Sequence, residues 1–410
     1  MEETPKVPAI RFKGFIDAWK QRKLSQLADF GKGQGYTKSD LKESGTPIIL
    51  YGRLYTHYHT IIREVDTFAN FKSGAFLSKG GEVIVPSSGE TSEDIAIAAT
   101  VDNAGILIGG GLNIVFPNKE IQSSFLAVEI SFGKPHAELA KRAQGKSIVH
   151  LYNEDLKQVI ISYPTIEEQR EISMLFYDLD HLITLYQRKL SKLKNIKKSM
   201  LDKLFPKEGQ DTPDLRFAGF TDAWEQRKLG ELMMIIGGNA WKSEDYSDTG
   251  NYLVVTIANV NGRYFIDDSF GNRIDVDNPG VYLLRKNDIL ISLTGNVGRV
   301  SKMTEIPAVL NQRVAKVVVD RANIDNEFIY QILSSFRFEN AMIKAGQGAA
   351  QSNISNSNVK EYSAFMPNSR SEQAEIGAVF KHLDNLITLH QRKLDKLQNV
   401  KKSLLEKMFV

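Results

Sequence analysis

Residues 168–205 read EQREISMLFYDLDHLITLYQRKLSKLKNIKKSMLDKLF, and residues 372–409 read EQAEIGAVFKHLDNLITLHQRKLDKLQNVKKSLLEKMF. The two segments are offset by 204 positions, and 24 of their 38 residues are identical. Proline precedes each segment, at Pro164 and Pro367, and neither segment has glycine or proline in its last thirty residues. The sequence therefore predicts two long helices with nearly the same surface.

Apolar side chains recur every seven residues in both segments, with a companion row, as at the a and d positions of a coiled coil. Each helix of about 37 residues would be about 55 Å long, and a stripe of that length needs a partner. We expect the two helices to pair antiparallel around a pseudo-two-fold axis, with a domain at each end. The predicted seam consists of Ile172, Leu175, Leu179, Leu182, Leu193, Ile196, Met200, Ile376, Val379, Leu383, Leu386, Leu397, Val400 and Leu404. Both copies break the heptad pattern at the same position of the repeat, where lysine (Lys189 and Lys393) replaces the expected apolar residue. The next residue, Leu190 or Leu394, is predicted to fill its place in the seam.

A second, shorter repeat precedes each variable region. Residues 8–27 (PAIRFKGFIDAWKQRKLSQL) and 213–232 (PDLRFAGFTDAWEQRKLGEL) match at thirteen of twenty positions. Between the repeats, residues 31–163 and 236–366 share only scattered points, such as Gly89 opposite Gly295. A period of about 205 residues indicates a duplicated domain rather than a solenoid, whose repeats run about 20 to 50 residues. We expect one fold that carries two different surfaces.

The variable regions contain short apolar runs, separated by glycine and serine clusters, that favour strands, and longer runs that favour helices. The predicted strands are 47–50, 82–85, 106–108, 112–116, 252–257, 288–292 and 313–319, and the predicted helices are 122–131, 136–143 and 325–343. The fold class is therefore α+β, with two globular α/β domains joined by two long helices. The predicted boundaries are residues 1–163 and 207–366 for the domains, and 164–206 and 367–410 for the helices.

Composition is that of an ordinary globular chain, with 410 residues, 42% hydrophobic and 25% charged. The net charge of +3 argues against coating of nucleic acid by bulk charge, so any binding must use local groups. Cysteine is absent, which excludes disulfides and a cysteine nucleophile and fits a reducing cytoplasm. The first residues do not resemble a signal peptide, and no apolar run is long enough to span a membrane. We therefore expect a cytoplasmic protein.

Familiar catalytic motifs are missing. Gly145-Lys146-Ser147 lacks the first glycine of a phosphate-binding loop, because Ala140 occupies that place. No Pro-Pro dipeptide exists, which excludes the Asn/Asp-Pro-Pro-aromatic loop of an adenine methyltransferase. His57 and His59 are the one close histidine pair, and a plain surface explains them better than a metal site. We expect no metal or cofactor in this chain and interpret it as a binding protein, not an enzyme.

The duplicated P-x-[LI]-R-F-x-G-F-x-D-A-W-x-Q-R-K-L, at Pro8–Leu24 and Pro213–Leu229, and the duplicated E-Q-x-E-I…L-D-x-L-I-T-L-x-Q-R-K-L…K-K-S, at Glu168–Ser199 and Glu372–Ser403, resemble a known family. Both are similar to the specificity subunit of type I restriction-modification systems, and the resemblance spans the whole chain. It implies two target recognition domains, each reading one half of a split DNA sequence. It also implies that the helices set the gap and dock two modification subunits.

The same resemblance assigns the chemistry to partners. It implies adenine methylation with S-adenosylmethionine bound by the modification subunit, and cleavage by a restriction subunit that uses ATP and Mg. Such systems defend cells against phage. A split site needs two readers on one face of DNA, where successive major grooves lie about 34 to 36 Å apart.

Base edges are read by Arg, Lys, Asn, Gln and hydroxyl groups. Candidates in the first domain are Lys32, Gln34, Tyr36, Lys38, Tyr51, Arg53, Tyr55, His57, Tyr58, Ser87, Ser88, Lys141, Arg142, Gln144 and Lys146. Candidates in the second domain are Asn239, Trp241, Lys242, Asn259, Asn261, Arg263, Tyr264, Thr294, Asn296, Arg299, Asn311, Gln312, Arg313, Gln347, Gln351 and Asn353. Residues 141–146 and 344–351 occupy equivalent loops with different side chains, as two readers of different sequences require. Any one of these residues could equally be plain surface.

Other residues have a structural explanation. The side chains of the repeated N-terminal motif are interpreted as packing residues: Arg11, Phe12, Phe15, Trp19, Phe217, Phe220 and Trp224. The basic helix tails, 187–205 and 391–409, are read as solvated flanks, with contact to phosphate or to an acidic partner as the alternative. Two other functions stay open. The chain could be a methyltransferase or nuclease with unfamiliar motifs, or an adaptor whose domains bind protein.

Overall fold

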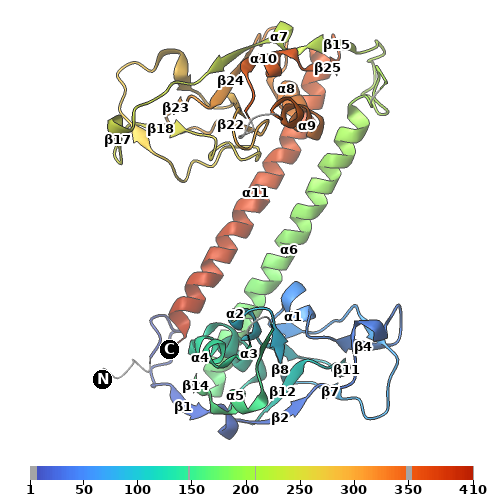
Figure 1. Cartoon of the computed structure of the whole chain (residues 1–410), viewed down its shortest axis with the longest axis vertical. Coiled ribbons are helices and arrows are strands. Elements are labelled where there is room, and N and C mark those ends of the chain that lie inside the picture. The colour runs from blue at the N-terminus through green and yellow to red at the C-terminus, as the bar shows by residue number, and fades with distance from the viewer. Residues whose placement is uncertain (1–6, 146–147, 208, 348–352, 410) are drawn as a thin grey trace. The chain divides into compact units, whose positions relative to one another are not determined.

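The computed structural model describes residues 7–145, 148–207, 209–347 and 353–409. The chain divides into two compact units, Met1–Tyr186 with Leu394–Val410, and Gln187–Lys393. We call them unit 1 and unit 2. Each unit combines one α/β region with part of each of the two long helices (Figure 1).

Unit 1 contains two five-stranded mixed sheets. The order of the first sheet is β2 (Ala28–Lys32), β12 (Leu112–Pro117), β8 (Glu82–Pro86), β10 (Ala99–Val101) and β5 (Ile61–Ile62). The order of the second is β3 (Leu41–Lys42), β6 (Phe68–Ala69), β4 (Thr46–Ile49), β11 (Ala104–Ile108) and β7 (Leu77–Lys79). Two short antiparallel pairs complete the unit, β1 (Lys20–Lys23) with β14 (Ile160–Tyr163), and β9 (Ser88–Gly89) with β13 (Val149–His150).

Unit 2 repeats this topology. Its first sheet is ordered β16 (Met233–Gly237), β24 (Val314–Val319), β21 (Ile289–Ser292) and β22 (Val300–Lys302). Its second is ordered β17 (Tyr246–Ser247), β19 (Arg273–Ile274), β18 (Tyr252–Val255), β23 (Ala308–Leu310) and β20 (Leu283–Leu284), and β15 (Glu225–Lys228) pairs with β25 (Ser363–Met366). The predicted internal duplication and α+β fold class are confirmed, although the two variable regions share little sequence.

The central strands bury both faces, because neighbouring residues of a strand point to opposite sides. In β8, Val83 and Val85 join the core that includes Trp19 and the helices, whereas Ile84 joins the core that lines the second sheet. In β21, Ile289 and Leu290 divide in the same way. Continuous apolar runs such as 82–85 and 288–292 therefore appear in the sequence without alternation.

Short helices accompany the sheets in both units. In unit 1 they are α1 (Arg53–Thr56), α2 (Ser92–Ile95), α3 (Ser123–Phe132), α4 (Lys134–Arg142) and α5 (Asn153–Gln158). In unit 2 they are α7 (Leu229–Leu232), α8 (Asn326–Leu333), α9 (Phe336–Ala345) and α10 (Asn356–Glu361). The predicted helix 325–343 is broken in two, because the Ser335 hydroxyl accepts a hydrogen bond from the backbone N–H of Phe338 and starts a new helix.

Two 39-residue helices, α6 (Ile166–Leu204) and α11 (Arg370–Met408), confirm the prediction from the repeats. Within each unit they pack antiparallel. In unit 1, Phe176 contacts Phe409 and Asp180 contacts Lys401. The residue numbers rise along α6 as they fall along α11, so the two helices run in opposite directions. In unit 2, Lys197 contacts Asp384, and Phe205 contacts Phe380 in the same reversed order.

The predicted seam is only partly buried. Ile172, Leu179 and Ile376 are buried, and so are Leu190 and Leu394, which take over after the break in the heptads. The remaining partly buried members are Leu175, Leu193, Met200, Val379, Leu383, Leu386, Leu397 and Leu404. The prediction is wrong for three positions, because Leu182, Ile196 and Val400 are 41%, 38% and 40% exposed. Two helices bury only a narrow stripe, and a straight helix drifts about 20° per heptad away from it.

The N-terminal motifs hold the ends of the helices. The guanidinium of Arg11 donates two hydrogen bonds to the Glu168 carboxylate, at 2.6 and 2.7 Å, and Arg216 binds Glu372 in the same way at 2.7 and 2.8 Å. Trp19 and Trp224 are buried in the two main cores, which confirms their interpretation as packing residues. Within the described ranges, every helix is too short or too polar to cross a bilayer.

Candidate nucleic-acid interface

A set of five residues in unit 1 closes the end of the first sheet. Beyond β8, the N–H of Ser87 donates to the Gly111 carbonyl at 2.8 Å, and the N–H of Leu151 donates to the Ser87 carbonyl at 3.2 Å. The next residue, Ser88, pairs with His150 in the two-residue ladder between β9 and β13. We call Ser87, Ser88, Gly111, His150 and Leu151 the strand-end platform of unit 1.

Unit 2 has the same platform with different residues. The N–H of Leu293 donates to the Arg313 carbonyl at 3.0 Å, and the N–H of Ile354 donates to the Leu293 carbonyl at 2.9 Å. Thr294 and Asn353 form the matching antiparallel bridge. Leu293, Thr294, Arg313, Asn353 and Ile354 are therefore the strand-end platform of unit 2, and three main-chain pairings recur between two regions of unrelated sequence.

Each platform carries one polar side chain fixed by a neighbouring hydroxyl. In unit 1, His150 Nδ1 lies 3.2 Å from Ser88 Oγ. In unit 2, Thr294 Oγ1 donates to Asn353 Oδ1 at 3.0 Å. Asn353 is exposed and His150 is half-buried, so both present hydrogen-bonding atoms at the surface.

Aromatic side chains surround the platform of unit 1. Tyr152 stacks on His150, with ring centroids 6.1 Å apart and planes 17° apart. The Tyr55 hydroxyl donates to the Ser88 carbonyl at 2.9 Å, and Tyr51 packs edge-on against Tyr55. These three tyrosines are exposed, and burial of the Tyr55 hydroxyl among acidic neighbours raises the pKa of that group.

Amides and a guanidinium take the corresponding place in unit 2. Asn239 and Asn311 form a parallel bridge, and Gln312 and Arg313, with exposed side chains, immediately precede β24. Trp241 is half-buried nearby in sequence, with Nε1 donating to the Leu310 carbonyl at 3.0 Å. The two surfaces therefore offer different chemistry on the same scaffold.

Most of the predicted DNA-contacting residues lie at the surface. Those exposed are Lys32, Gln34, Lys38, Tyr51, Tyr55, His57, Lys141, Gln144, Lys242, Arg263, Asn296, Gln312, Arg313, Gln347 and Asn353. Those half-buried are Arg53, Tyr58, Ser88, Arg142, Asn239, Trp241, Asn261, Arg299 and Asn311. Several are engaged with neighbours, as Arg142 is with Glu138 and Arg53 with Asp66. Lys146 and Gln351 lie outside the described residues.

Five predicted contacts are wrong, because the side chains are buried: Tyr36, Ser87, Asn259, Tyr264 and Thr294. Asn259 is fully buried and donates to the carbonyls of Asp267 and Phe270, so it shapes its own loop. The Tyr264 hydroxyl donates to Glu327, which also pairs with the buried Lys302. The Tyr36 hydroxyl donates to the Asn70 carbonyl.

Tyr58 is a further correction. Its hydroxyl donates to the Ala98 carbonyl at 3.0 Å and lies 3.1 Å from Ser131 Oγ, and burial raises the pKa of the phenol to about 12. The hydrogen-bonding end of this residue therefore lies inside the domain. Two surface residues were missed, His150 and Tyr152. They follow the loop 141–146, whose equivalence with 344–351 was the one available signal.

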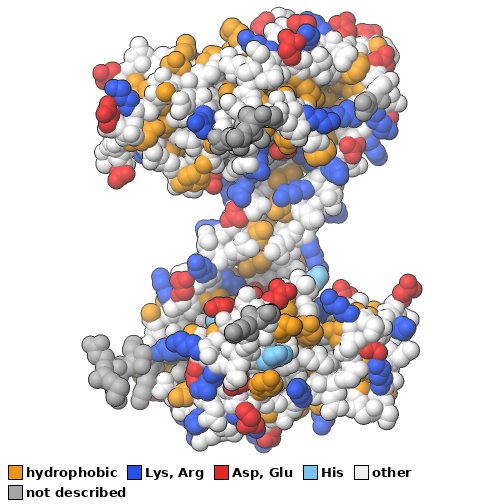
Figure 2. All heavy atoms as spheres, viewed as in Figure 1, with side chains coloured by type: hydrophobic (Ala, Val, Ile, Leu, Met, Phe, Trp, Pro, Cys, Tyr) orange, Lys and Arg blue, Asp and Glu red, His pale blue; other side chains and the backbone are white. Residues whose placement is uncertain are grey.

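Charge is mixed on the surface. Figure 2 shows acidic and basic side chains interspersed over both units, with hydrophobic side chains exposed among them. This agrees with the near-neutral composition and favours recognition by particular side chains over bulk attraction. Among the described residues, no three His, Asp or Glu side chains gather as a metal site would require.

Comparison with known proteins agrees with this geometry. The family model of the type I restriction modification DNA specificity domain matches twice, over residues 16–195 and 221–399. The type I restriction enzyme MjaVIII specificity subunit of Methanocaldococcus jannaschii is 25% identical over 312 residues, covering 73% of this chain and 72% of that protein. The EcoAI specificity subunit of Escherichia coli is 28% identical over 177 residues, covering 40% of this chain and 28% of that protein.

A solved structure shares the fold. The crystal structure of the type I restriction-modification system S subunit from M. genitalium has a TM-score of 0.71 and 16% identity, covering 98% of this chain and 99% of that one. Two α/β units with two long helices thus define a DNA specificity subunit, a class distinct from the catalytic subunits. The chain belongs to the family of type I restriction modification DNA specificity proteins.

Proposed function

We propose that each unit reads one half of an asymmetric, bipartite DNA site on behalf of a type I restriction-modification complex. The helices fix the gap between the half-sites and dock two modification subunits, which methylate adenine with S-adenosylmethionine. A restriction subunit that uses ATP and Mg adds cleavage. One observation supports the two-reader proposal above others: the strand-end platforms share their backbone pairing and differ in every exposed side chain.

Exposed apolar side chains on the helices support partner docking. Leu185 and Leu389 occupy equivalent positions of the repeat and are 45% and 47% exposed. Ile196 and Val400, also equivalent, are similarly exposed. Exposed apolar groups that recur at matched positions suit two copies of one protein partner.

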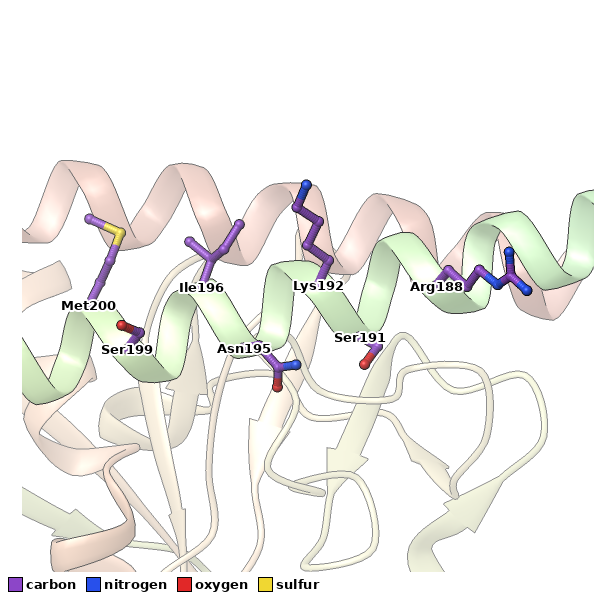
Figure 3. A pocket seen from close by; sticks show the side chains of 7 residues that line it. All are labelled: Arg188, Ser191, Lys192, Asn195, Ile196, Ser199 and Met200. Atoms are coloured by element: carbon purple, nitrogen blue, oxygen red, sulfur yellow. The ribbon is translucent and has the colours of Figure 1, made fainter. Parts of the chain in front are cut away.

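An open groove of about 590 Å³ lies along α6 beside this surface. Figure 3 shows its lining, with Lys192, Ile196 and Met200 on one side of the helix and Ser191 and Asn195 on the other. The groove contains none of the predicted DNA-contacting residues, and its mixture of apolar and basic groups favours a protein surface with acidic side chains.

Replacing Leu185 and Leu389 together by glutamate is expected to weaken binding of the modification subunit at least tenfold. The apolar contacts would be lost and two charges would be desolvated, while the exposed positions should leave folding unchanged. Titration followed by light scattering measures the affinity. Gln187→Glu adds one negative charge beside the site without removing an apolar side chain and serves as the control. Undiminished affinity of the double variant would locate the docking surface elsewhere.

A fragment of residues 1–206 is expected to form a two-fold dimer that directs methylation of a palindromic split site with its partner. In unit 1, α6 packs against residues 394–408, and residues 190–204 of a second copy are their counterparts. In the full chain, Lys401 Nζ lies 2.5 Å from a carboxylate oxygen of Asp180. In the dimer of fragments, Lys197 of the second copy would take the place of Lys401 in this ion pair.

Light scattering and methylation mapping test this fragment. Lys197→Asp in the fragment should give monomers, and Asp180→Lys added to it should recover the dimer. A wild-type fragment that remains monomeric in the presence of the modification subunit, or that yields an asymmetric site, would contradict the two-fold pairing.

The proposed function is tested by expressing the chain with and without its modification subunit and mapping methylated adenines across the host genome. A split motif that appears when both chains are present is the expected result. Methylation by the chain alone would instead indicate an enzyme. The absence of methylation with an active partner would favour an adaptor that binds protein.

A further inference from the structure

We infer that His150 and Asn353 are the specificity-determining residues at one equivalent position in each half-site. This inference rests on the proposed function and narrows it from two surfaces to two side chains. Both residues pair through the backbone with the residue that follows the end of a central strand, Ser88 or Thr294. Both have a side chain whose orientation a hydroxyl fixes.

His150 and Asn353 occupy equivalent positions in the two platforms. Three main-chain pairings place the two residues in the same position of their platforms, although the two variable regions share little sequence. A protein that reads two different sequences with one fold needs such a place, where the backbone is constant and the side chain is free to change. Gly89 and Gly295, which follow the two hydroxyl residues, are among the few points that the two variable regions share.

The Asn353 side chain is oriented by a hydrogen bond from Thr294. Thr294 Oγ1 donates to Asn353 Oδ1, and in this orientation both hydrogens of Nδ2 and one lone pair of Oδ1 are directed to other partners. An asparagine amide in this state matches adenine, whose N7 accepts and whose N6 donates in the major groove. We therefore assign Asn353 to an adenine of the second half-site. Fixing the side chain in advance reduces the entropy lost on binding.

His150 presents different chemistry. Nδ1 lies beside Ser88 Oγ, so Nε2 is the ring atom left for a base edge. Tyr152 stacks on the ring and holds its plane. A single ring nitrogen makes one hydrogen bond, whereas the Asn353 amide can make two. We therefore assign His150 to one base pair of the first half-site, where it should distinguish the correct base from the others less strongly than Asn353 does.

The neighbours of the two residues also diverge in a manner that suits two readers. At the place of Arg313 in unit 2, unit 1 has Gly111, where a Cβ would lie 2.7 Å from the ring of Tyr51. The first platform is thus bordered by an aromatic ring and the second by a cation. Stacking and sugar contacts suit the ring, and phosphate or guanine contacts suit the cation.

The test exchanges the two side chains. His150→Asn and Asn353→His are each assembled with an active modification subunit, and the complexes select binding sequences from a library with both half-sites randomised. Asn353→His should lower the preference for adenine at one position of the second half-site by roughly ten- to hundredfold. The first half-site should keep its sequence. His150→Asn should change one position of the first half-site only.

Ser88→Ala and Thr294→Ala probe the orienting hydroxyls and should weaken preference at the same two positions. Lys119→Ala and Asp277→Ala, exposed residues outside the platforms, are the matched controls and should select the wild-type sequence. Unchanged preferences in both exchange variants would overturn the inference, and so would loss of both half-sites from a single exchange. A wild-type complex that selects no split sequence would instead refute the proposed function.

Discussion

Asp384→Ala is expected to destabilise unit 2 by about 3–5 kcal/mol. The Asp384 carboxylate accepts two hydrogen bonds from Lys197 Nζ, at 2.7 and 2.9 Å, and one from Gln331 Nε2 at 2.9 Å. The side chains of Asp384 and Lys197 are only 6% and 17% exposed, so removal of the carboxylate leaves a buried cation without its partner. One substitution therefore weakens the contact of α11 with both α6 and α8.

The equivalent pair in unit 1 offers an internal comparison. Asp180 contacts Lys401 at 2.5 Å and accepts a hydrogen bond from Thr60 at 2.9 Å, but its side chain is 18% exposed. Solvent screens this pair more strongly, so Asp180→Ala should cost less than Asp384→Ala. The two pairs are related by the repeat offset of 204 residues, which places the same register-setting contact once in each unit.

Chemical denaturation followed by hydrogen exchange, which separates the two units, measures both variants. Lys197→Met combined with Asp384→Leu is the control, because replacing a buried ion pair by apolar side chains often restores stability. A destabilisation below about 1 kcal/mol for Asp384→Ala would show that the pair is solvated and does not set the register of the helices.

Glu129→Gln is expected to make unit 1 more stable than the wild type at pH 8.5 and to leave it nearly unchanged at pH 5. Glu129 lies in α3, is fully buried, and neither carboxylate oxygen has a hydrogen-bond partner within normal geometry. Burial raises the pKa of this group from its ordinary 4.5 to about 8, against smaller opposing effects of the Ser162 backbone and Lys134.

The direction of the pH dependence follows from proton binding. Between pH 4.5 and pH 8 the folded chain keeps a proton on Glu129 that the unfolded chain has released. The free energy of unfolding therefore falls as pH rises through this range, by an amount on the order of 5 kcal/mol for such a shift. Glutamine cannot ionise, so the variant should lose this part of the dependence.

Denaturation of unit 1 at several pH values between 5 and 9 provides the measurement. Glu154→Gln, at an exposed position of α5, is the matched control and should keep the wild-type profile. Parallel profiles for Glu129→Gln and the wild type would mean that solvent reaches the carboxyl. In unit 2 the equivalent residue is Ile332, which is buried and has no such dependence.

The sequence predicted those elements whose signal is local. Both long helices were evident because their repeats run for 38 residues, and the strands 82–85, 112–116 and 288–292 were evident because each is a continuous apolar run. Strand order was beyond reach, since partners such as β4 and β11 lie more than fifty residues apart. The sequence also did not predict the exposure of Leu182. A heptad pattern shows which residues share one face of a helix, but not how much of that face the partner helix covers.

The candidate site was predicted less well, for a related reason. Polar residues in loops were assumed to face solvent, yet Asn259 and Tyr264 turn inward to satisfy carbonyls and a buried carboxylate. His150 escaped notice because its partner Ser88 is 62 residues away and the contact exists only after the sheet has formed. Asn353, by contrast, was predicted as one of the polar loop residues that could reach a base, two positions beyond the loop 344–351.

The composition of unit 1 has a consequence for biosynthesis. Phe409 packs against Trp19, Phe125 and Phe176, and Met408 is buried in the same core. These residues leave the ribosome after every residue of unit 2 has been translated. The hydrophobic core around Trp19 therefore remains incomplete until the whole of unit 2 has been synthesised. Translation that stops within the α/β region of unit 2 would yield a chain whose unit 1 core lacks its own C-terminal residues and whose second reader is incomplete. Chaperones and proteases recognise such exposed apolar surface, so we expect cells to remove these products.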